Sequence, residues 1–425
     1  MSKYLITGGV PVGGTIKASG NKNAALPCIA AAILTDDPVI LRNIPDIEDV
    51  QVMLDVYRSF GGAVEELEKN AYKLSLGNIK SSRVPAEAAK KIRASILFAG
   101  PLLARTGKAV LPPPGGDVIG RRRLDTHFLA LTELGAAVAV KNAFTFTAKK
   151  LKGADIFLDE TSVTATENAV MAAVLAEGTT IISNAASEPH VQDLCRMLRA
   201  MGALIEGIGS NILTIRGVKK LGSCDYAIGA DYMEVGSFIG LAAATRGELV
   251  IGGVKPAELR PAKMAFGKLG ISWEHEGTSL RVPKNQAMKV NHDLGGMIPK
   301  IDDAPWPGFP PDLTSIIIVT ATQVEGTVLV YEKMFESRMF FVDKLIGMGA
   351  RIVLCDPHRA VVSGPAKLAG SEMTSPDVRA GMAMVIAAMA AEGNSVIRNV
   401  YQIERGYENL TERLALLGGK IRREE

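Results

Sequence analysis

One pattern occurs six times along this chain: an apolar helical run, a glycine, and then a strand-like pair of apolar residues. Successive glycines lie 67 to 79 residues apart, at Gly61, Gly135, Gly202, Gly270, Gly349 and Gly418. A glycine at such a point can take the left-handed conformation that ends a helix and turns the chain into a strand. A unit of about 70 residues is longer than a solenoid repeat, which spans about 20–50 residues. The pattern therefore predicts six α/β modules, each with helices and several strands.

Six modules in 425 residues favour two lobes of three, because a chain of this length exceeds one ordinary core. The first three glycines precede residue 230, so we expect a boundary near 223–231, in the segment SCDYAIGAD. The first 20 residues have β-structure character, and we expect a terminal strand to pair with the other lobe. A site between two lobes is the default expectation for such an architecture.

Composition and charge exclude several classes of protein. The chain is 47% hydrophobic and 22% charged, and its net charge of +3 does not indicate nucleic-acid binding. Its N-terminus lacks the apolar core of a signal peptide, and its apolar runs are too short for a membrane span. The four cysteines form no CxxC pair and there are only five histidines, so we expect buried free thiols, no metal site and a cytosolic location.

The segment LPPPGGDVIGRRRLDTH, residues 111–127, is predicted to be a loop, since it contains three prolines and three glycines. Asp117 is near its tip, and Arg121, Arg122 and Arg123 are at its base. Three adjacent arginines repel one another and favour a phosphate or carboxylate partner. The alternative is a solvated basic turn, which is common for charge runs.

Two further cations stand at predicted helix starts. Lys22 and Asn23 follow Gly20 and precede a helical run, and Arg93 heads the apolar run KIRASILFAGPLLA. Backbone N–H groups at a helix N-terminus favour anions, and an arginine there is locally unfavourable unless an anion is shared. The alternative for Lys22 is an exposed lysine near a helix cap.

The segments SGNKNAALP, IPDIEDV, RAS, PGGDVIGRR, LDTH, PGFPPD, MFESR, DVRAG and IERGYE occur in this order along the chain. Together they resemble the UDP-N-acetylglucosamine 1-carboxyvinyltransferase family over essentially the whole length. The resemblance implies the enolpyruvyl transferase fold, a two-lobed inside-out α/β barrel with three βαβαββ units in each lobe. It implies an N-terminal lobe over 22–229 with a mobile lid loop at 111–124. The C-terminal lobe would comprise 1–21 plus 230–425, with the active site in the cleft between the lobes.

The reaction implied by the resemblance is transfer of enolpyruvyl from phosphoenolpyruvate to the 3′-hydroxyl of UDP-N-acetylglucosamine, with release of phosphate. It would open peptidoglycan synthesis in the cytoplasm and need no metal or organic cofactor. The implied partners are these two small molecules, with no nucleic acid and no membrane.

The resemblance also assigns residue roles. The expected catalytic residues are Lys22, Asp117 as proton donor and Asp312 as base for the sugar hydroxyl. Phosphoenolpyruvate would be bound by Lys22, Asn23, Arg122, Arg338, Arg379 and Arg405, with Asp231 and Asp377 in or near the same cleft. UDP-N-acetylglucosamine would be bound by Asn23, Arg93, Arg122, Arg123, Leu124, Asp125, Thr126, Ser162, Val163, Thr164, Asp312 and Met334.

Three positions depart from the family's common pattern. Asp117 stands where most members have cysteine, and a carboxylic acid can also deliver a proton. Glu160 replaces a common lysine and Thr164 a common glycine. Two other functions remain open at this point: a shikimate-type enolpyruvyl transferase, and a non-catalytic UDP-sugar sensor that kept the fold.

Asp117 predicts resistance to fosfomycin, an epoxide that alkylates the loop thiolate of the family. A carboxylate is a much poorer nucleophile than a thiolate, so we expect activity to persist during incubation with the drug. The measurement is residual activity against time at low drug concentration. Time-dependent irreversible loss of activity would contradict the prediction.

Overall fold

The computed structural model describes residues 2–116, 120 and 123–425. The chain forms two compact units. Unit 1 contains residues 2–19 and 230–425, and unit 2 contains 20–116 and 123–229. The chain passes from unit 1 to unit 2 between Ser19 and Gly20, two residues before the expected boundary, and returns between Gly229 and Ala230.

Unit 2 contains three sheets, two of four strands and one of three. The first has the order β13 (Cys224–Ala227), β3 (Val39–Arg42), β5 (Ala71–Ser75), β4 (Ala63–Glu68). The second has the order β6 (Lys108–Leu111), β8 (Phe144–Thr147), β7 (Ala137–Val140). The third has the order β9 (Asp155–Phe157), β10 (Thr179–Ser183), β12 (Ile212–Arg216), β11 (Leu204–Glu206).

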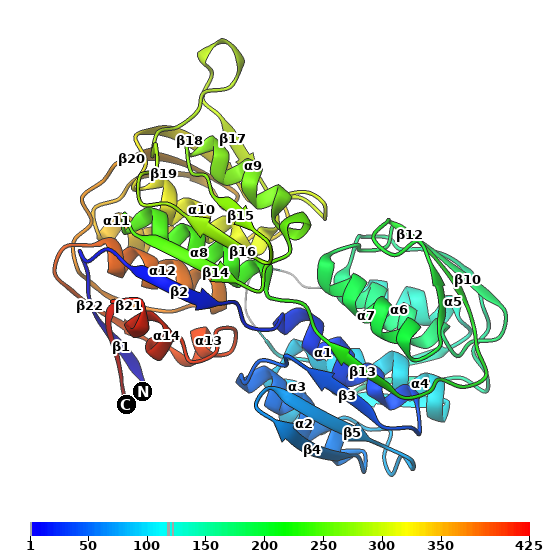
Figure 1. Ribbon diagram of the computed structural model, residues 1–425. Helices are drawn as coiled ribbons and strands as arrows, with labels where there is room; N and C mark the ends of the chain where they lie inside the picture. The colour runs from blue at the N-terminus through cyan, green and yellow to red at the C-terminus, as the bar shows by residue number, and fades with distance from the viewer. Residues whose placement is uncertain (1, 117–119, 121–122) are drawn as a thin grey trace. The chain divides into compact units, whose positions relative to one another are not determined.

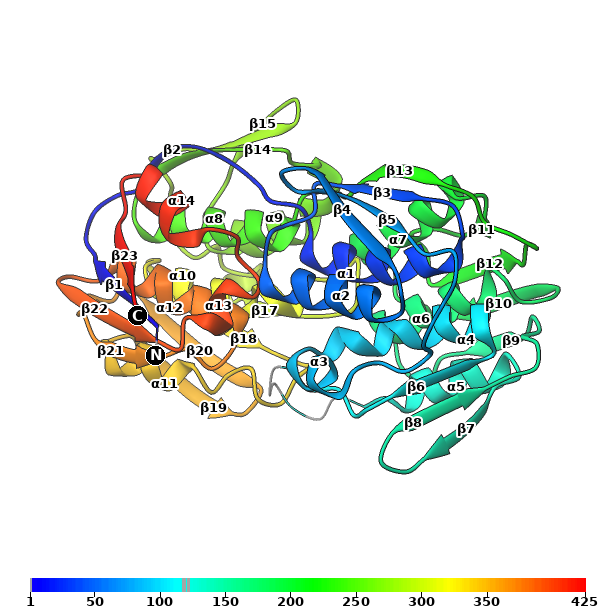
Figure 2. The ribbon, with the colours of Figure 1, turned by 90° about the horizontal axis from the view of Figure 1, so that it is seen from below.

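Unit 1 repeats this arrangement in three further sheets. Their orders are β2 (Gly13–Lys17), β14 (Glu248–Gly252), β16 (Ser279–Val282), β15 (Glu274–Glu276); β17 (Lys300–Asp302), β18 (Gly326–Tyr331), β20 (Arg359–Gly364), β19 (Arg351–Asp356); and β21 (Glu372–Thr374), β22 (Asn394–Arg398), β1 (Lys3–Thr7), β23 (Lys420–Glu424). The first strands of the chain thus pair with strands from its C-terminal half, as expected. The first and last strands of the chain, β1 and β23, pair antiparallel (Figure 2).

The six glycines of the sequence repeat all have positive φ, between 68° and 103°. Each stands between a helix and the outermost strand of a sheet. The six strands that follow are β4, β7, β11, β15, β19 and β23, and the helices that precede are α2 (Glu48–Ser59), α5 (Asp125–Glu133), α7 (Pro189–Ala200), α9 (Arg260–Lys268), α11 (Val342–Gly347) and α14 (Leu410–Leu416). The predicted repeat of six α/β modules is therefore confirmed.

A second set of helices is buried between the sheets. In unit 1 these central helices are α8 (Tyr232–Ala244), α10 (Thr314–Ala321) and α12 (Val378–Ala390), which pack against one another (Figure 1). In unit 2 they are α1 (Lys22–Ala31), α4 (Ala99–Thr106) and α6 (Val163–Ala173). A helix that is apolar on all sides must be buried, and α10, with the sequence TSIIIVTA, has no exposed residue. Helices inside and sheets outside are the expected inside-out architecture.

Short helices complete the two units. They are η1 (Ala32–Leu34), α3 (Ala86–Lys91), η2 (Arg93–Phe98), η3 (Pro256–Leu259), η4 (Leu294–Gly296), η5 (Pro311–Leu313) and α13 (Tyr401–Glu404). Arg93 does start the predicted apolar helix, but its first turns are 3₁₀ rather than α. Within the described chain, no helix is long and apolar enough to cross a membrane.

All four cysteines are free, but the expectation that they are buried is wrong for two of them. Cys28 and Cys195 are buried, whereas Cys224 is half-buried and Cys355 is exposed. The last two lie on strands whose side chains alternate between half-buried and exposed.

Candidate active site

In unit 1, Asp312 is held by two arginines from different segments. It lies in η5, just before the central helix α10. Its Oδ1 accepts a hydrogen bond from Arg338 Nη2 at 2.5 Å, and its Oδ2 accepts one from Arg379 Nε at 3.0 Å. The side chains of Arg338 and Arg379 are only 10% and 6% exposed, against 21% for Asp312. The carboxylate is therefore the most open member of the cluster, and it bridges the two cations.

The charge state of Asp312 follows from two opposing effects. Burial alone raises the pKa of its carboxyl group, but the attraction of Arg338 and Arg379 outweighs it and holds the pKa well below its usual range. Asp312 is thus ionised at neutral pH. Arg338 also stacks on Phe335, with 4.9 Å between its guanidinium carbon and the ring centroid.

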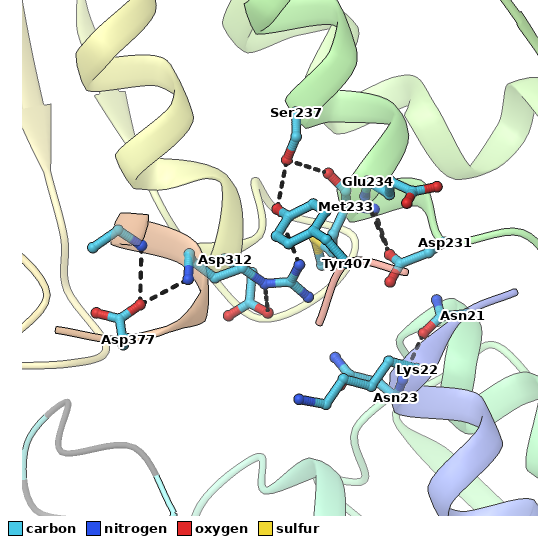
Figure 3. A network of polar contacts seen from close by, with 12 residues as sticks. Asn21, Lys22, Asn23, Asp231, Met233, Glu234, Ser237, Asp312, Asp377 and Tyr407 are labelled. Carbon is cyan, nitrogen blue, oxygen red and sulfur yellow. Dashed lines mark hydrogen bonds and ion pairs between the residues drawn. The ribbon is translucent and has the colours of Figure 1, made fainter. Parts of the chain in front are cut away.

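Arg379 connects all three central helices of unit 1. It is on the first turn of α12, contacts Asp312 before α10, and donates from Nη1 to Tyr407 Oη at 3.3 Å. The Tyr407 hydroxyl lies 2.8 Å from Ser237 Oγ, which donates in turn to the carbonyl of Met233 on α8 (Figure 3). The contacts of the buried arginine therefore reach three modules: its own, that of Asp312 and, through Tyr407, that of Ser237.

Two carboxylates cap helices beside this cluster. Asp231 Oδ1 accepts from the backbone N–H groups of Met233 and Glu234, at 2.9 and 3.3 Å (Figure 3). Asp377 Oδ1 accepts from the N–H groups of Arg379 and Ala380, at 2.8 and 2.9 Å. Each satisfies donors that the first turn of a helix leaves without intrahelical partners. Asp231 and Asp377 therefore stabilise these helix starts. They also lie near residues that are expected to bind phosphoenolpyruvate.

In unit 2, the predicted junction of loop and helix is confirmed around Lys22. Asn21 caps α1 by accepting from the N–H groups of Asn23 and Ala24, at 2.9 and 3.3 Å (Figure 3). Lys22 Nζ makes an ion pair with Asp49 Oδ2 at 2.5 Å. Both side chains are mostly buried, so Lys22 is not the exposed lysine of the alternative reading. An acidic residue on the first turn of α2 fixes it instead.

A second polar cluster of unit 2 surrounds the start of α5. Arg123 pairs with Asp125 at 3.0 Å and with Asp159 at 3.1 Å, and its carbonyl accepts from Arg93 Nη2 at 3.0 Å. Thr126 Oγ1 donates to Asp159 Oδ1 at 2.7 Å. Arg123 is more than one-third exposed, so these pairs contribute little to stability and leave it accessible.

A buried chain of hydrogen bonds fixes the hydroxyl group of Thr164. Asn168 Oδ1 accepts from the Gly100 N–H at 2.8 Å, so its Nδ2 must be the group that donates to His127 Nδ1 at 3.0 Å. His127 therefore carries its proton on Nε2 and donates it to Thr164 Oγ1 at 3.1 Å. Burial first, and the charge of Arg93 second, lower the pKa of His127 to about 3, so the ring stays neutral.

The predicted site residues fall into two groups by unit. Unit 1 contains Asp231, Asp312, Met334, Arg338, Asp377, Arg379 and Arg405. Unit 2 contains Lys22, Asn23, Arg93, Arg123, Leu124, Asp125, Thr126, Ser162, Val163 and Thr164. Asp117, Arg121 and Arg122 lie outside the described residues. In unit 1 the structure brings Asp312, Arg338 and Arg379 into contact, and in unit 2 it brings Arg93, Arg123 and Asp125 into contact. Arg405 is buried next to Gln402, to which it donates at 2.9 Å.

Several supporting residues were not found from the sequence: Asp49, Tyr407 and Ser237, as well as the His127–Asn168 pair. Asp49 and Tyr407 lie in the segments IPDIEDV and IERGYE. The resemblance of these segments to the family could have pointed to both residues. No group of three or more His, Cys, Asp or Glu side chains among the described residues is arranged to hold a metal ion.

Comparison with known proteins decides the family. A model of the EPSP synthase (3-phosphoshikimate 1-carboxyvinyltransferase) family matches residues 6–414. This chain belongs to that family of enolpyruvyl transferases. It is 73% identical over 425 residues to a protein of Treponema denticola and 66% identical over 424 residues to one of Treponema pallidum. Both are named UDP-N-acetylglucosamine 1-carboxyvinyltransferase, and the matches cover 100% of each chain.

Solved structures show the same fold at low sequence identity. The enolpyruvyl transferase NikO of Streptomyces tendae aligns over 100% of this chain and 99% of its own, with a TM-score of 0.88 and 22% identity. An EPSP synthase of Acinetobacter baumannii covers 100% of both chains, with a TM-score of 0.77 and 18% identity. The enolpyruvyl transferase fold expected from the sequence is thus confirmed, and the chain is a transferase.

The ion pairs of Asp312 predict a pH-dependent effect of D312N in this transferase. Removing the charge leaves two buried arginines without their bridge, which should cost roughly 3–5 kcal/mol of unfolding free energy at pH 7. Because the folded-state pKa is depressed, this stabilisation is present above the unfolded pKa of about 3.9 and is lost as pH falls through the folded value. Urea unfolding from pH 7 downward should show a constant difference from wild type that narrows below about pH 4.

The matched control is D343N, which removes an exposed carboxylate from α11. It should leave the unfolding free energy within about 0.5 kcal/mol of wild type. If D312N were as stable as D343N at pH 7, the charge of Asp312 would not be stabilising the cluster.

Proposed function

We propose that this chain transfers the enolpyruvyl group of phosphoenolpyruvate to the 3′-hydroxyl of UDP-N-acetylglucosamine and releases phosphate. In the cell this would be the first committed step of peptidoglycan synthesis, carried out in the cytoplasm. The observation that carries the proposal is Asp312, an ionised carboxylate on a rigid turn after two prolines, at the exposed edge of a buried arginine pair. The names of the relatives at 73% and 66% identity point to the same acceptor.

The arginines of unit 1 suit a substrate that carries a carboxylate. Arg338 and Arg379 each hold one oxygen of Asp312, and planar guanidinium groups bind carboxylates well. When phosphoenolpyruvate binds, its carboxylate would take over part of this pairing. Asp312 would lose some of the attraction that depresses its pKa, and so become a stronger base for the sugar hydroxyl.

The proposed reaction is an addition followed by an elimination, and its atoms balance. The 3′-oxygen bonds to C2 of phosphoenolpyruvate while its proton passes to Asp312, and Asp117 gives a proton to C3. The bond between C2 and the phosphate oxygen then breaks, C3 returns a proton to Asp117, and the double bond forms again on the transferred group. The proton taken up by Asp312 leaves with the released phosphate. Lys22, Arg122 and Arg405 would bind the phosphate that leaves. Lys22 would exchange its contact with Asp49 for the phosphate oxygens.

The nucleotide sugar would be bound by residues of unit 2, together with Asp312 and Met334. Asn23, Arg93, Arg122, Arg123, Leu124, Asp125, Thr126, Ser162, Val163 and Thr164 form the proposed set. The geometry of Thr164 supports this role. Its oxygen accepts a hydrogen bond from His127, so its own hydroxyl hydrogen can donate to a ligand. Ser162 caps α6, whose N-terminal N–H groups favour the diphosphate.

Phosphate release with phosphoenolpyruvate and each candidate acceptor tests the proposed function. We expect release with UDP-N-acetylglucosamine, and none with shikimate 3-phosphate or without acceptor. D312N should release phosphate about 10²–10⁴ times more slowly, the range for loss of a general base, while D343N should match wild type.

Two outcomes would overturn the proposal. Release that depends on shikimate 3-phosphate would make the chain a shikimate-type transferase. Tight binding of UDP-N-acetylglucosamine in calorimetry, with no phosphate released when phosphoenolpyruvate is present, would make it a UDP-sugar sensor.

A further inference from the structure

Two buried carboxyl groups stand at the roots of the loops that carry Asp312 and Arg338. Asp303 follows β17 and opens the acid loop, residues 303–313, while Glu332 follows β18 and opens the arginine loop, residues 332–341. The two strands are parallel neighbours, with Asp302 opposite Tyr331. The roots of both loops therefore lie side by side, and their far parts meet again in the ion pair of Asp312 with Arg338.

One oxygen of each carboxyl group binds the first amides of the arginine loop. Asp303 Oδ1 accepts from the Lys333 N–H at 2.5 Å, and Glu332 Oε1 accepts from the N–H groups of Met334 and Phe335, at 3.3 and 3.2 Å. Three consecutive amides are thus held by these two side chains. The same loop continues directly to Arg338. The two acids therefore fix the position of the backbone that leads to this arginine.

The second oxygen of each group is buried and, within the described part of the chain, has no hydrogen-bond partner. Asp303 Oδ2 and Glu332 Oε2 are both in this state, and the two residues are only 1% and 0% exposed. A carboxylate oxygen buried without a donor costs several times the value of a normal hydrogen bond. Two ionised carboxylates cannot satisfy each other, but a single proton placed between them satisfies both oxygens at once.

We propose that Asp303 and Glu332 share one proton, and that this protonated pair is a positioning device for Asp312 and Arg338 in the enolpyruvyl transfer. The effect on turnover rests on the proposed function, whereas the shared proton does not. With the proton in place, the pair ties the two loop roots together. Without it, two adjacent negative charges would repel each other inside the core and push the roots apart.

The charges around the pair agree with this state. Burial raises the pKa of Glu332 to about 9, with Arg338 lowering it and Asp303 raising it further. The hydroxyl group of Thr314, on the first turn of α10, also lowers the pKa of Glu332. From the β19–β20 turn, His358 Nδ1 donates to the Glu332 carbonyl at 2.7 Å, and Lys333 is occupied by Asp302 at 2.8 Å. No cation other than Arg338 is among the principal influences on the Glu332 carboxyl group.

The sign of the pH dependence follows from the raised pKa. The stabilising contribution of the protonated pair is complete below the unfolded carboxyl value of about 4.3 and is lost as pH rises through about 9. Wild type should therefore lose stability between pH 7 and pH 10. E332Q carries permanent N–H donors in place of the proton and should not show this loss.

Infrared spectroscopy on E332Q and D303N tests the shared proton without any substrate. At pH 7 the difference spectrum between wild type and each variant should show the C=O stretch of a buried protonated carboxyl group that both variants lack. The band of Glu167, whose pKa burial also raises, cancels in this difference. D303N should lose the band of the shared proton because the asparagine amide can donate to Glu332, which then ionises. E325Q, at the opposite and exposed end of β18, is the control and should keep the band.

Three results would overturn the proposal. A band that persists in D303N would assign the proton to Glu332 alone, and a band missing from wild type would mean two carboxylates bridged by water. The third is an equal loss of stability in wild type and E332Q between pH 7 and pH 10. Where wild type turns over, its kcat/KM should also fall about tenfold more than that of E332Q between pH 8 and pH 10, as for a group with a pKa near 9. Wild type without turnover but with the band would contradict only the proposed function.

Discussion

The first turn of a buried helix has backbone N–H groups that no residue of the helix can satisfy. Six helices of this protein are central in their units, so each of these turns must be met by polar groups from elsewhere. Asn21, Ser162, Asp231 and Asp377 cap four of them. Arg93 and Asp312 lie in the 3₁₀ turns that lead into α4 and α10. The repeat that builds the core therefore also produces six polar helix ends. Part of the candidate site is found there, namely Asn23, Arg93, Ser162, Asp312 and Arg379.

Buried charge is tolerated at these ends because each charge has a defined partner. Asp312 is bridged by two arginines, Lys22 is paired with Asp49, and Arg413 is paired with Glu234. Such pairs are rarely a large source of stability, since desolvation offsets much of their attraction. These ion pairs hold the charged side chains in a fixed geometry. They can also be exchanged, because a substrate anion can take the place of the protein carboxylate. Among the described residues, neither Asp303 nor Glu332 forms an ion pair of this kind, and a shared proton would satisfy both carboxyl groups.

The sequence predicted the features that depend on local rules. Gly61 and its five equivalents end helices with positive φ, and Lys22 stands at a helix start, because both depend on residues adjacent in the chain. What it could not predict are contacts between distant residues. Arg379 joins three modules through its contact with Asp312 and, by way of Tyr407, with Ser237. Asp303 meets Glu332 only because β17 and β18 are neighbours. The exposed thiol of Cys355 was missed because its strand is at the edge of a sheet.

The chemical identity of the product is the most direct test of the account. After incubation with phosphoenolpyruvate and UDP-N-acetylglucosamine, the isolated nucleotide sugar should be heavier by one enolpyruvyl group in place of hydrogen. Its proton NMR spectrum should place two vinyl hydrogens on a group attached to the 3′-oxygen. Recovery of unchanged UDP-N-acetylglucosamine from an active, folded preparation, or attachment at any other oxygen, would contradict the account.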